Sequence, residues 1–216
     1  MREVGTAGTQ EVIQDSIASI YKEMVEVMDE GVGKIIQSLK ETGQYENTII
    51  VFISDNGANH YGNNGGLRGF KGGAYEGGSR VPAIFSFPKE IEGGGVNDQT
   101  ILSMDLLPTL LDFIGKEPSS SIDGISIKEN LLEQKKLPER DVFFAYGNKS
   151  FIRSGDWKLV VIEDKTGEKI ELFNLSEDLQ ERNDLHSKEP DLSNRLLKKL
   201  ETWAVEVREG VDLVSR

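Results

Sequence analysis

One glycine-rich segment carries the residues whose types and spacing suit chemistry. It begins with Ser54-Asp55-Asn56-Gly57, continues through residues 67–72 and ends in residues 75–82. Asp55 and Asn56 offer hard oxygen donors, which suit Ca²⁺ or Mg²⁺ rather than a soft metal. Two such ligands do not complete the coordination shell of a hard divalent ion, so the sequence predicts a partial metal site. The alternative is an Asn-Gly turn that Asp55 caps.

Three cations share this segment. Lys71 is the best candidate for binding an oxyanion, because its ammonium is a compact point charge and nearby glycines let the backbone come close. Arg68 and Arg80 could add forked contacts to an anion or pair with Glu76, and Arg80 is the more readily assigned to a structural ion pair. A solvated surface charge is the alternative for each cation.

Histidine and nucleophile patterns add little to this segment. His60 follows Asn56 by four residues and could donate a proton to a leaving group near neutral pH, although a surface histidine is an equal alternative. His186 lies in a polar segment and is expected to be inert. Zinc-hydrolase histidine pairs, Gly-x-Ser-x-Gly and the Walker pattern do not occur in the sequence, so no nucleophile is evident.

Composition excludes several partners. The 216 residues carry a net charge of −12 and contain no cysteine, so disulfides and thiolate metal sites are impossible in this chain. We expect no nucleic-acid partner, because no basic stripe is available to neutralise phosphates. We also expect no membrane partner, because no run of about 18 apolar residues occurs. Residues 1–5 lack the apolar core of a signal peptide.

Hydrophobic periodicity predicts the elements that position the segment. Apolar residues at three- and four-residue steps predict a helix over 10–42, and the β-branched run at 48–53 predicts a strand buried on both faces, as in a parallel sheet. Residues 57–78 contain nine glycines and form a loop too long for a simple connection. A second strand is expected over 80–87. Asp55 and Asn56 therefore follow the carboxyl end of a strand, where ligands bind in open α/β sheets.

The remainder of the chain predicts two further groups of elements. Pro108 suits the first turn of a helix at 109–114, after a separate turn at 103–107. Four short strands at 142–146, 149–153, 157–162 and 169–173 suggest an antiparallel meander, and a final amphipathic helix is expected over 191–207. The sequence thus predicts an α/β part up to about residue 140 and a smaller α+β part after it.

Several of these segments together resemble the type I (arylsulfatase-like) sulfatase family of the alkaline phosphatase superfamily. The family pattern of Ser-Asp-Asn-Gly, Leu-Arg-Gly-x-Lys and Glu-Gly-Gly-x-Arg-Val-Pro occurs at 54–57, 67–71 and 76–82. Residues 103–110, 123–124, 152–159 and 171–175 extend the resemblance toward the end of the chain. The match covers nearly the whole sequence, and the combination of motifs is specific.

The resemblance implies a fold and a set of roles. Residues 1–140 would be the C-terminal part of an alkaline-phosphatase-like α/β sandwich catalytic domain. Residues 141–216 would be a small α+β subdomain with an antiparallel sheet and a C-terminal helix. Asp55 and Asn56 would ligate Ca²⁺, with Mg²⁺ as an alternative, and Lys71 would bind the sulfate of a small molecule or carbohydrate. His60 and Arg68 are weaker candidates for catalysis and substrate binding. Family members are usually periplasmic, secreted or lysosomal.

The family nucleophile is a formylglycine made within Cys/Ser-x-Pro-x-Arg, a motif that these 216 residues do not contain. Residues 136–140 imitate its spacing with a lysine, which cannot yield formylglycine. We therefore expect a sulfuric ester hydrolase portion that is inactive alone. Its partners would be the missing N-terminal portion or a second copy at an exposed sheet edge. A phosphoester or phosphonate hydrolase of the same superfamily and a non-catalytic binding or assembly module are the two competing interpretations.

Overall fold

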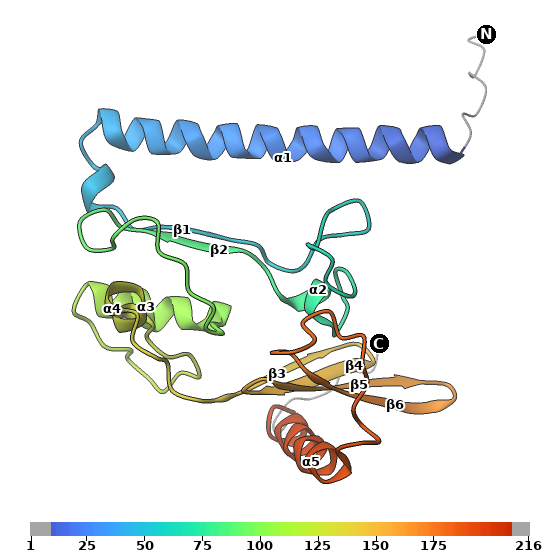
Figure 1. Ribbon diagram of the computed structural model, residues 1–216. Coiled ribbons are helices and arrows are strands. Elements are labelled where there is room, and N and C mark those ends of the chain that lie inside the picture. Colours follow the sequence, from blue (N-terminus) through green and yellow to red (C-terminus); the bar gives the residue numbers. More distant parts are fainter. Residues whose placement is uncertain (1–9, 209–216) are drawn as a thin grey trace. The chain divides into compact units, whose positions relative to one another are not determined.

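The computed structural model describes residues 10–208 (Figure 1). These residues divide into two compact units. The first, which we call the loop–sheet unit, combines the chain up to Met24 with Ser54–Val81 and the region from Glu139 onward. The second, the hairpin unit, combines Val25–Ile53 with Pro82–Pro138. The glycine-rich segment therefore groups with the C-terminal region rather than with the strands that flank it in sequence.

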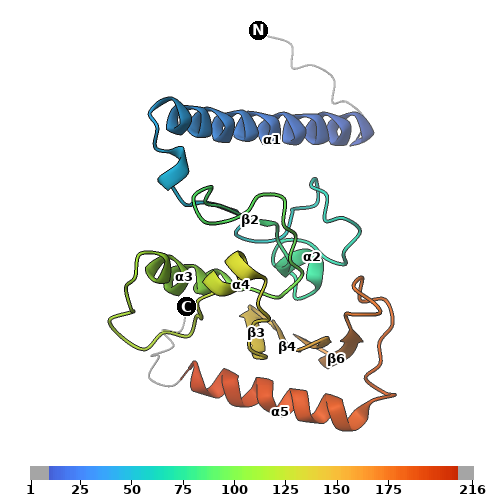
Figure 2. The same cartoon turned by 60° about the vertical axis from the view of Figure 1, so that its left-hand side comes forward.

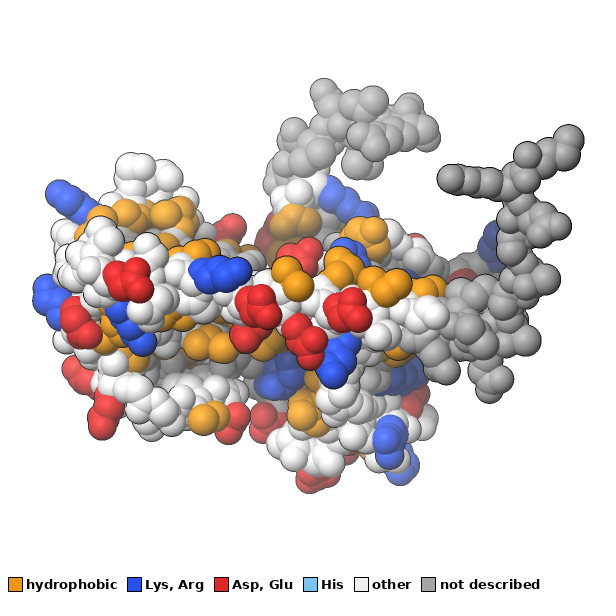
Figure 3. Space-filling view, turned by 90° about the horizontal axis from the view of Figure 1, so that it is seen from above, with side chains coloured by type: hydrophobic (Ala, Val, Ile, Leu, Met, Phe, Trp, Pro, Cys, Tyr) orange, Lys and Arg blue, Asp and Glu red, His pale blue; other side chains and the backbone are white. Residues whose placement is uncertain are grey.

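The N-terminal helix α1 spans Gln10–Glu41, which confirms the helix predicted from the apolar spacing. Gly43 ends it in the left-handed conformation at φ +69°, and the Gln44 N–H donates to Leu39 O at 2.8 Å. On the face shown in Figure 3, acidic and basic side chains of α1 are interspersed with hydrophobic ones. Among the latter, Met24 and Ile35 are more than 60% exposed. Within residues 10–208, no helix combines the length and apolarity needed to cross a bilayer.

The strands β1, Ile50–Ile53, and β2, Ala83–Ser86, form a two-stranded sheet in the hairpin unit, after a 3₁₀ turn η1 at Tyr45–Asn47. They pair antiparallel, with Ile50 opposite Ser86 and Ile53 opposite Ala83. The prediction of a doubly buried parallel strand was therefore wrong for this pair, and β1 is only half-buried. The physical reason is the connection. Parallel neighbours need a crossover element that returns the chain to its starting end, whereas residues 54–82 lead the chain directly back alongside β1.

Short helices complete the hairpin unit. They are the 3₁₀ turn η2 at Ser103–Asp105, then α3 at Leu106–Phe113 and α4 at Lys128–Glu133. Asp105 is fully buried, and its carboxylate accepts the backbone N–H groups of Leu102 at 2.8 Å and Ile125 at 3.0 Å. A Cβ at Gly124 would lie 2.1 Å from Met104 O, so only glycine fits there. These contacts give the motifs at 103–110 and 123–124 a structural role.

The C-terminal sheet consists of β3, Asp141–Tyr146, β4, Lys149–Ser154, β5, Trp157–Asp164, and β6, Gly167–Asn174. The strands pair antiparallel in chain order, which confirms the predicted meander. Helix α5, Pro190–Glu206, confirms the predicted final helix. It covers one face of the sheet with Leu196 and Leu200, which pack against buried residues such as Ile152, Leu159 and Leu172.

The opposite face of this sheet supports the glycine-rich segment. In two views the short helix α2, Glu76–Ser79, lies on one side of the strands and α5 on the other (Figures 1 and 2). Side chains alternate along a strand, so Leu159 points toward α5 while Lys158 and Val160 point toward the glycine-rich segment. All three are fully buried. Strand β5 is therefore covered on both faces, and one of its buried residues is a lysine.

Candidate metal and anion site

The predicted site residues lie on the glycine-rich segment. It forms a loop over Ser54–Val81, which we call the glycine-rich loop, directly after β1 ends at Ile53. Asp55, His60 and Lys71 are exposed, and Asn56 is half-buried. Between residues 10 and 208, the side chains of Asp55, Asn56 and Lys71 make no hydrogen bond or ion pair with other described residues. The Asp55 carboxylate and the Lys71 ammonium are thus exposed to solvent, and all three side chains are free to bind a ligand.

Backbone hydrogen bonds fold the loop so that Lys71 lies beside the segment that follows Asn56. The Lys71 N–H donates to Ala58 O at 2.9 Å, and the Gly57 N–H donates to Gly78 O at 2.9 Å. Residues 56–58 are therefore held between two later parts of the same loop. The hydrogen bond to Ala58 thus places the backbone of Lys71 near that of Asp55 and Asn56, although sixteen positions separate Asp55 from Lys71 in the sequence.

Asn64 closes this arrangement and was not singled out from the sequence. Its Oδ1 accepts the Ala58 N–H at 2.9 Å, and its Nδ2 donates to Gly69 O at 2.6 Å. One side chain therefore joins the strand-proximal end of the loop to the Arg-Gly-x-Lys segment. An asparagine among glycines is common in turns, so the sequence signal for this role is weak.

Three glycines of the loop are required by close backbone approach. A Cβ at Gly57 would lie 1.9 Å from Gly77 O, and one at Gly77 would lie 2.3 Å from Gly69 O. A Cβ at Gly78 would meet Gly73 O at 2.4 Å. Any larger residue at these positions would push apart the backbone segments that carry Asp55 and Lys71.

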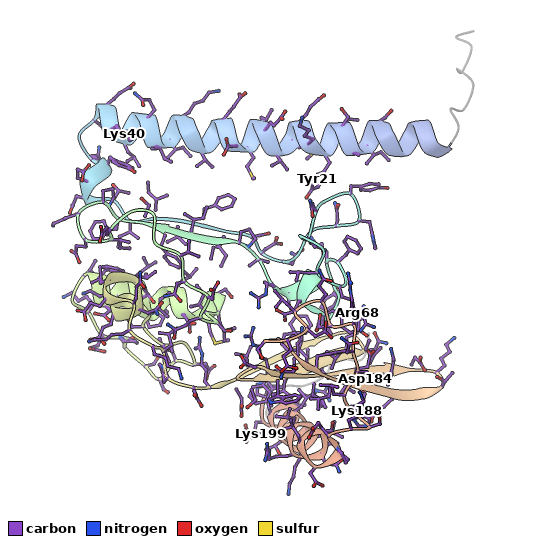
Figure 4. The ribbon with its side chains drawn as sticks, viewed as in Figure 1. Tyr21, Lys40, Arg68, Asp184, Lys188 and Lys199 are labelled. Carbon is purple, nitrogen blue, oxygen red and sulfur yellow. The ribbon has the colours of Figure 1, made fainter. Side chains whose placement is uncertain are left out.

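Arg68 is held by the C-terminal sheet. In Figure 4 it lies on the loop side of the sheet, whereas Lys199 of α5 lies on the opposite side. Its guanidinium donates to Glu181 O at 2.8 Å and to Tyr75 Oη at 3.0 Å, and it forms an ion pair with Glu171 at 3.3 Å. The predicted role of Arg68 as a substrate contact stays a prediction. The structure shows that several of its donors support the loop.

Tyr75 and Glu171 complete this contact through a hydrogen bond from the phenol to the carboxylate. Burial and the neighbouring Glu171 raise the pKa of Tyr75 well above its ordinary value. Burial alone would raise the pKa of Glu171. The hydrogen bond from Tyr75 and the positive charges of Lys169 and Arg68 outweigh it and hold that pKa below its usual range. Both groups therefore keep the protonation states that the hydrogen bond requires.

A second, deeper cluster lies under α2. Lys158 Nζ is 2.8 Å from Glu76 Oε1 and 3.0 Å from Glu181 Oε1. Arg80 Nε donates to Glu76 Oε2 at 2.7 Å, which confirms the predicted structural pairing of Arg80 with an acid. In addition, Lys149 Nζ donates at 2.9 Å to the backbone oxygen of Gly72, the residue that directly follows Lys71. The C-terminal sheet therefore supports the loop at several points.

His60 has a different environment. Its ring lies 4.6 Å from the ring of Phe70, centroid to centroid, at an angle of 46°. The side chain is exposed. This packing places the imidazole against the residue that directly precedes Lys71 in the loop, and its part in catalysis stays a prediction.

The donor set fits part of a calcium site. Asp55 and Asn56 provide one carboxylate and one amide oxygen, which are ligands that Ca²⁺ accepts. Among residues 10–208, no group of three or more acidic or histidine side chains gathers as a metal site. Ca²⁺ takes about six to eight oxygen ligands. These two side chains can therefore contribute to a shell that other donors complete.

Sequence relatives place the chain among sulfatases. The sequence pattern of the Sulfatase family matches residues 3–116, and that of the family described as N-sulphoglucosamine sulphohydrolase, C-terminal, matches residues 70–208. A sulfatase of Formosa agariphila is 32% identical over 86% of this chain and 39% of its own. An N-acetylglucosamine-6-O-sulfatase of Bacteroides thetaiotaomicron is 30% identical over 83% of this chain and 33% of its own.

Solved structures show the same relationship. The crystal structure of Ps i-CgsB has a TM-score of 0.78 and 29% identity, and the match covers 86% of this chain and 43% of that one. A protein crystallised with its substrate D-glucosamine-2-N,6-O-disulfate has a TM-score of 0.70 and 27% identity over 86% of this chain and 40% of its own. The chain thus spans about two fifths of the length of these proteins. Together, the motifs at Asp55, Asn56 and Lys71, the family patterns and the fold establish that the chain belongs to the sulfatase family.

Proposed function

We propose that this chain supplies the calcium ligands Asp55 and Asn56 and the sulfate-binding Lys71 of a sulfuric ester hydrolase. The observation that carries the proposal is the loop geometry. Lys71 is bonded through its backbone to Ala58, two residues beyond Asn56, while all three functional side chains are free of intramolecular partners in the described part of the chain. An anion placed beside them would meet the Lys71 ammonium and a cation held by Asp55 and Asn56 on the same loop.

The chemistry follows from charge. When a sulfate ester is cleaved, the bond from sulfur to the leaving oxygen breaks and negative charge grows on the departing group. The Lys71 ammonium would hold the non-bridging sulfate oxygens and orient the ester. Asp55 and Asn56 would fix the cation that sulfatases typically use, Ca²⁺, which would polarise the same oxygens. His60 is a candidate to protonate the leaving group.

The proposal places the nucleophile outside these 216 residues. Cys/Ser-x-Pro-x-Arg does not occur in them, so we expect no turnover by this chain alone. Residues 1–140 would then form the C-terminal part of an α/β sandwich catalytic domain and residues 141–216 its α+β subdomain. The remaining strands would cover the hairpin unit, where β1 and β2 pair only with each other among the described residues. Ile84 of β2 is 59% exposed.

The proposed substrate is a sulfated carbohydrate. One structural relative was crystallised with D-glucosamine-2-N,6-O-disulfate and another with k-i-k-neocarrahexaose. A phosphonate monoester hydrolase of Agrobacterium radiobacter has a TM-score of 0.66 at 23% identity, which shows a shared fold and no more. Lys71 within Arg-Gly-x-Lys favours sulfate over a phosphoester.

A chimera tests the proposal directly. This chain would replace the corresponding C-terminal part of the Formosa agariphila sulfatase, and hydrolysis of a chromogenic aryl sulfate would be measured. We expect Lys71→Met and Asp55→Ala each to lower kcat/KM on the order of 10²-fold, because each removes stabilisation of charge in the transition state. Lys165→Met, in the exposed β5–β6 turn, is the control. Activity that survives both site substitutions would refute the assignment.

Two measurements on the isolated chain test whether it acts by itself, as an enzyme or as a binding module. Aryl sulfate hydrolysis by the purified 216 residues would show that the nucleophile lies within them after all. Calorimetric titration with Ca²⁺ tests whether the partial site binds the ion without further donors. Binding that Asp55→Ala abolishes and Asp98→Ala leaves unchanged would favour the module. Absence of binding would favour a portion whose calcium shell needs further donors.

A further inference from the structure

Lys158 is a lysine without solvent exposure. It is fully buried in β5, and its ammonium lies over the Phe151 ring at 4.4 Å from the centroid. Its two carboxylate partners, Glu76 and Glu181, are only 4% and 0% exposed. The contact between Lys158 and Glu76 spans 82 positions of the sequence and joins a strand to the glycine-rich loop.

Stability alone is a poor explanation for this cluster. Removing charges from water is costly, and buried ion pairs often contribute no more stability than apolar side chains of similar volume. The alternating pattern of β5 would accept an apolar residue at position 158, as it does at Val160. Buried ionic groups can instead select one geometry among several, because a different arrangement would leave a charge unpaired.

The geometry that the cluster selects is that of α2. Glu76 is the first residue of this helix; its side chain accepts from Lys158, and its own N–H donates to Glu181 Oε2 at 2.6 Å. Both ends of Glu76 are thereby fixed to residues of the C-terminal region. Arg80, at the far end of α2, binds the remaining carboxylate oxygen of Glu76 at 2.7 Å.

Short hydrogen-bond paths lead from α2 to the site residues. The Gly77 N–H donates to Arg68 O at 2.7 Å, and Gly78 O accepts the Gly57 N–H at 2.9 Å. Gly57 follows Asn56 directly, and Arg68 lies three residues before Lys71. A shift of α2 would therefore move both the metal-ligand segment and the lysine segment. At Gly77 and Gly78 the backbone lies so close to the neighbouring backbone that not even a Cβ would fit between them.

We propose that Lys158, with Glu76 and Glu181, is a positioning residue that holds the glycine-rich loop in the conformation in which Asn56 and Lys71 lie together. The assignment of those two side chains to ligands rests on the proposed function. The positioning itself does not, since it concerns only the conformation of the loop.

Amide hydrogen exchange of the whole chain tests the proposal. Lys158→Met keeps the length of the side chain and removes its charge. We expect the amides of Gly57, Lys71 and Gly77 to exchange at least about tenfold faster, while amides of the β5–β6 pairing keep their protection, because local opening is separable from global unfolding. Lys165→Met, on the exposed turn of the same sheet, should change neither set.

A double variant keeps the test decisive if Lys158→Met destabilises the entire unit. Lys158→Met with Glu181→Gln removes one positive and one negative charge, so Arg80 remains the partner of Glu76. We expect this variant to regain protection in the sheet while the loop amides still exchange fast. If the loop amides regained wild-type protection in the double variant, Lys158 would serve only to balance the charge of Glu181, and the proposal would be overturned. Unchanged loop exchange in Lys158→Met would overturn it as well.

The exchange experiment and the chimera fail independently. A loop that loosens in Lys158→Met supports positioning even if Lys71→Met leaves hydrolysis intact, which would refute only the proposed function. If both hold, Lys158→Met in the chimera should lower kcat/KM, and Lys158→Arg, which keeps the charge, should recover part of the loss.

Discussion

The guanidinium carbon of Arg68 lies 3.7 Å from the centroid of the Tyr75 ring, and Nη2 of the same guanidinium donates to the Tyr75 hydroxyl at 3.0 Å. The hydroxyl in turn donates to Glu171 of β6. A residue whose motif suggests anion binding is thus part of the support between the loop and the sheet. Cation–π packing and a charged hydrogen bond act on the same side chain.

Tyr75→Phe tests the strength of this support. The substitution removes the hydroxyl and leaves Glu171 with one hydrogen-bond donor fewer in a nearly buried position. We expect the free energy of unfolding to fall by about 1.5–3 kcal/mol, the range for a hydrogen bond to a charged group. Urea denaturation gives the change. Tyr61→Phe, on an exposed residue of the same loop, is the control, and equal effects of the two substitutions would contradict the expectation.

Gly77→Ala tests the close backbone approach in the loop. The added Cβ would lie 2.3 Å from Gly69 O and 2.5 Å from Arg68 O, so backbone segments must separate. We expect a loss of about 1–3 kcal/mol, as for overpacking in a core. Gly93→Ala is the matched control, because no atom lies within 4 Å of its Cβ position. The control should be neutral or slightly stabilising. A neutral Gly77→Ala would show that the loop opens without cost.

Substitution of the site residues themselves should hardly affect stability. Asp55 and Lys71 are exposed, and their side chains have no partner among residues 10–208. We expect Asp55→Ala and Lys71→Ala each to change the free energy of unfolding by less than about 0.5 kcal/mol, as is usual for surface positions. Thermal and urea unfolding of the isolated chain provide the check. A loss above about 1.5 kcal/mol, the smallest value expected for Tyr75→Phe, would indicate a structural role instead.

The pH dependence of stability should separate Glu76 from Glu181. Burial tends to raise the pKa of Glu76, but the charges of Lys158 and Arg80 outweigh it and lower that pKa below its ordinary 4.5. Its stabilising contribution is therefore present above pH 4.5 and is lost as the pH falls through the lowered pKa. Burial raises the pKa of Glu181 above 4.5 despite Lys158. Its contribution is present below pH 4.5 and is lost as the pH rises through the raised pKa.

Unfolding free energies measured across acidic and neutral pH test this assignment. Relative to wild type, Glu76→Gln should lose less stability on acidification below pH 4.5. Glu181→Gln should lose less on raising the pH above 4.5. Glu117→Gln, at an exposed position, is the matched control substitution. Curves parallel to wild type for Glu76→Gln and Glu181→Gln would contradict the assigned shifts.

The sequence predicted the elements that have a strong period. The 32-residue helix α1, the four-strand meander and α5 all lie within a few residues of the expected bounds, because apolar residues at three- to four-residue steps favour a helix and short β-branched runs between turn residues favour strands. The pairing of Arg80 with an acid was also predicted, with Glu76 as one possible partner, but the helical turn that brings the two together was not.

Contacts between distant parts of the chain could not be predicted from sequence periodicity. The antiparallel direction of β1 and β2 depends on how residues 54–82 return, which an apolar run does not encode. In the sequence, nothing distinguishes Lys158 from a solvent-facing lysine of a strand. Only the fold shows that Glu76 and Glu181 lie beside its ammonium group. Asn64 likewise acquires its meaning from Ala58 and Gly69. Local pattern identifies which residues can react, whereas long-range contacts decide which residues hold them in place.

The complete burial of Lys158 gives the protein an internal chemical reporter. An amine-reactive acylating reagent meets Lys71 on the surface of the folded chain, but it reaches Lys158 only when β5 and the glycine-rich loop separate. Acylation would also remove the positive charge that Glu76 and Glu181 share, so a labelled molecule would not close again into the same conformation. The ratio of modification at these two lysines would therefore record, in a single mass spectrum, how often the loop leaves the sheet.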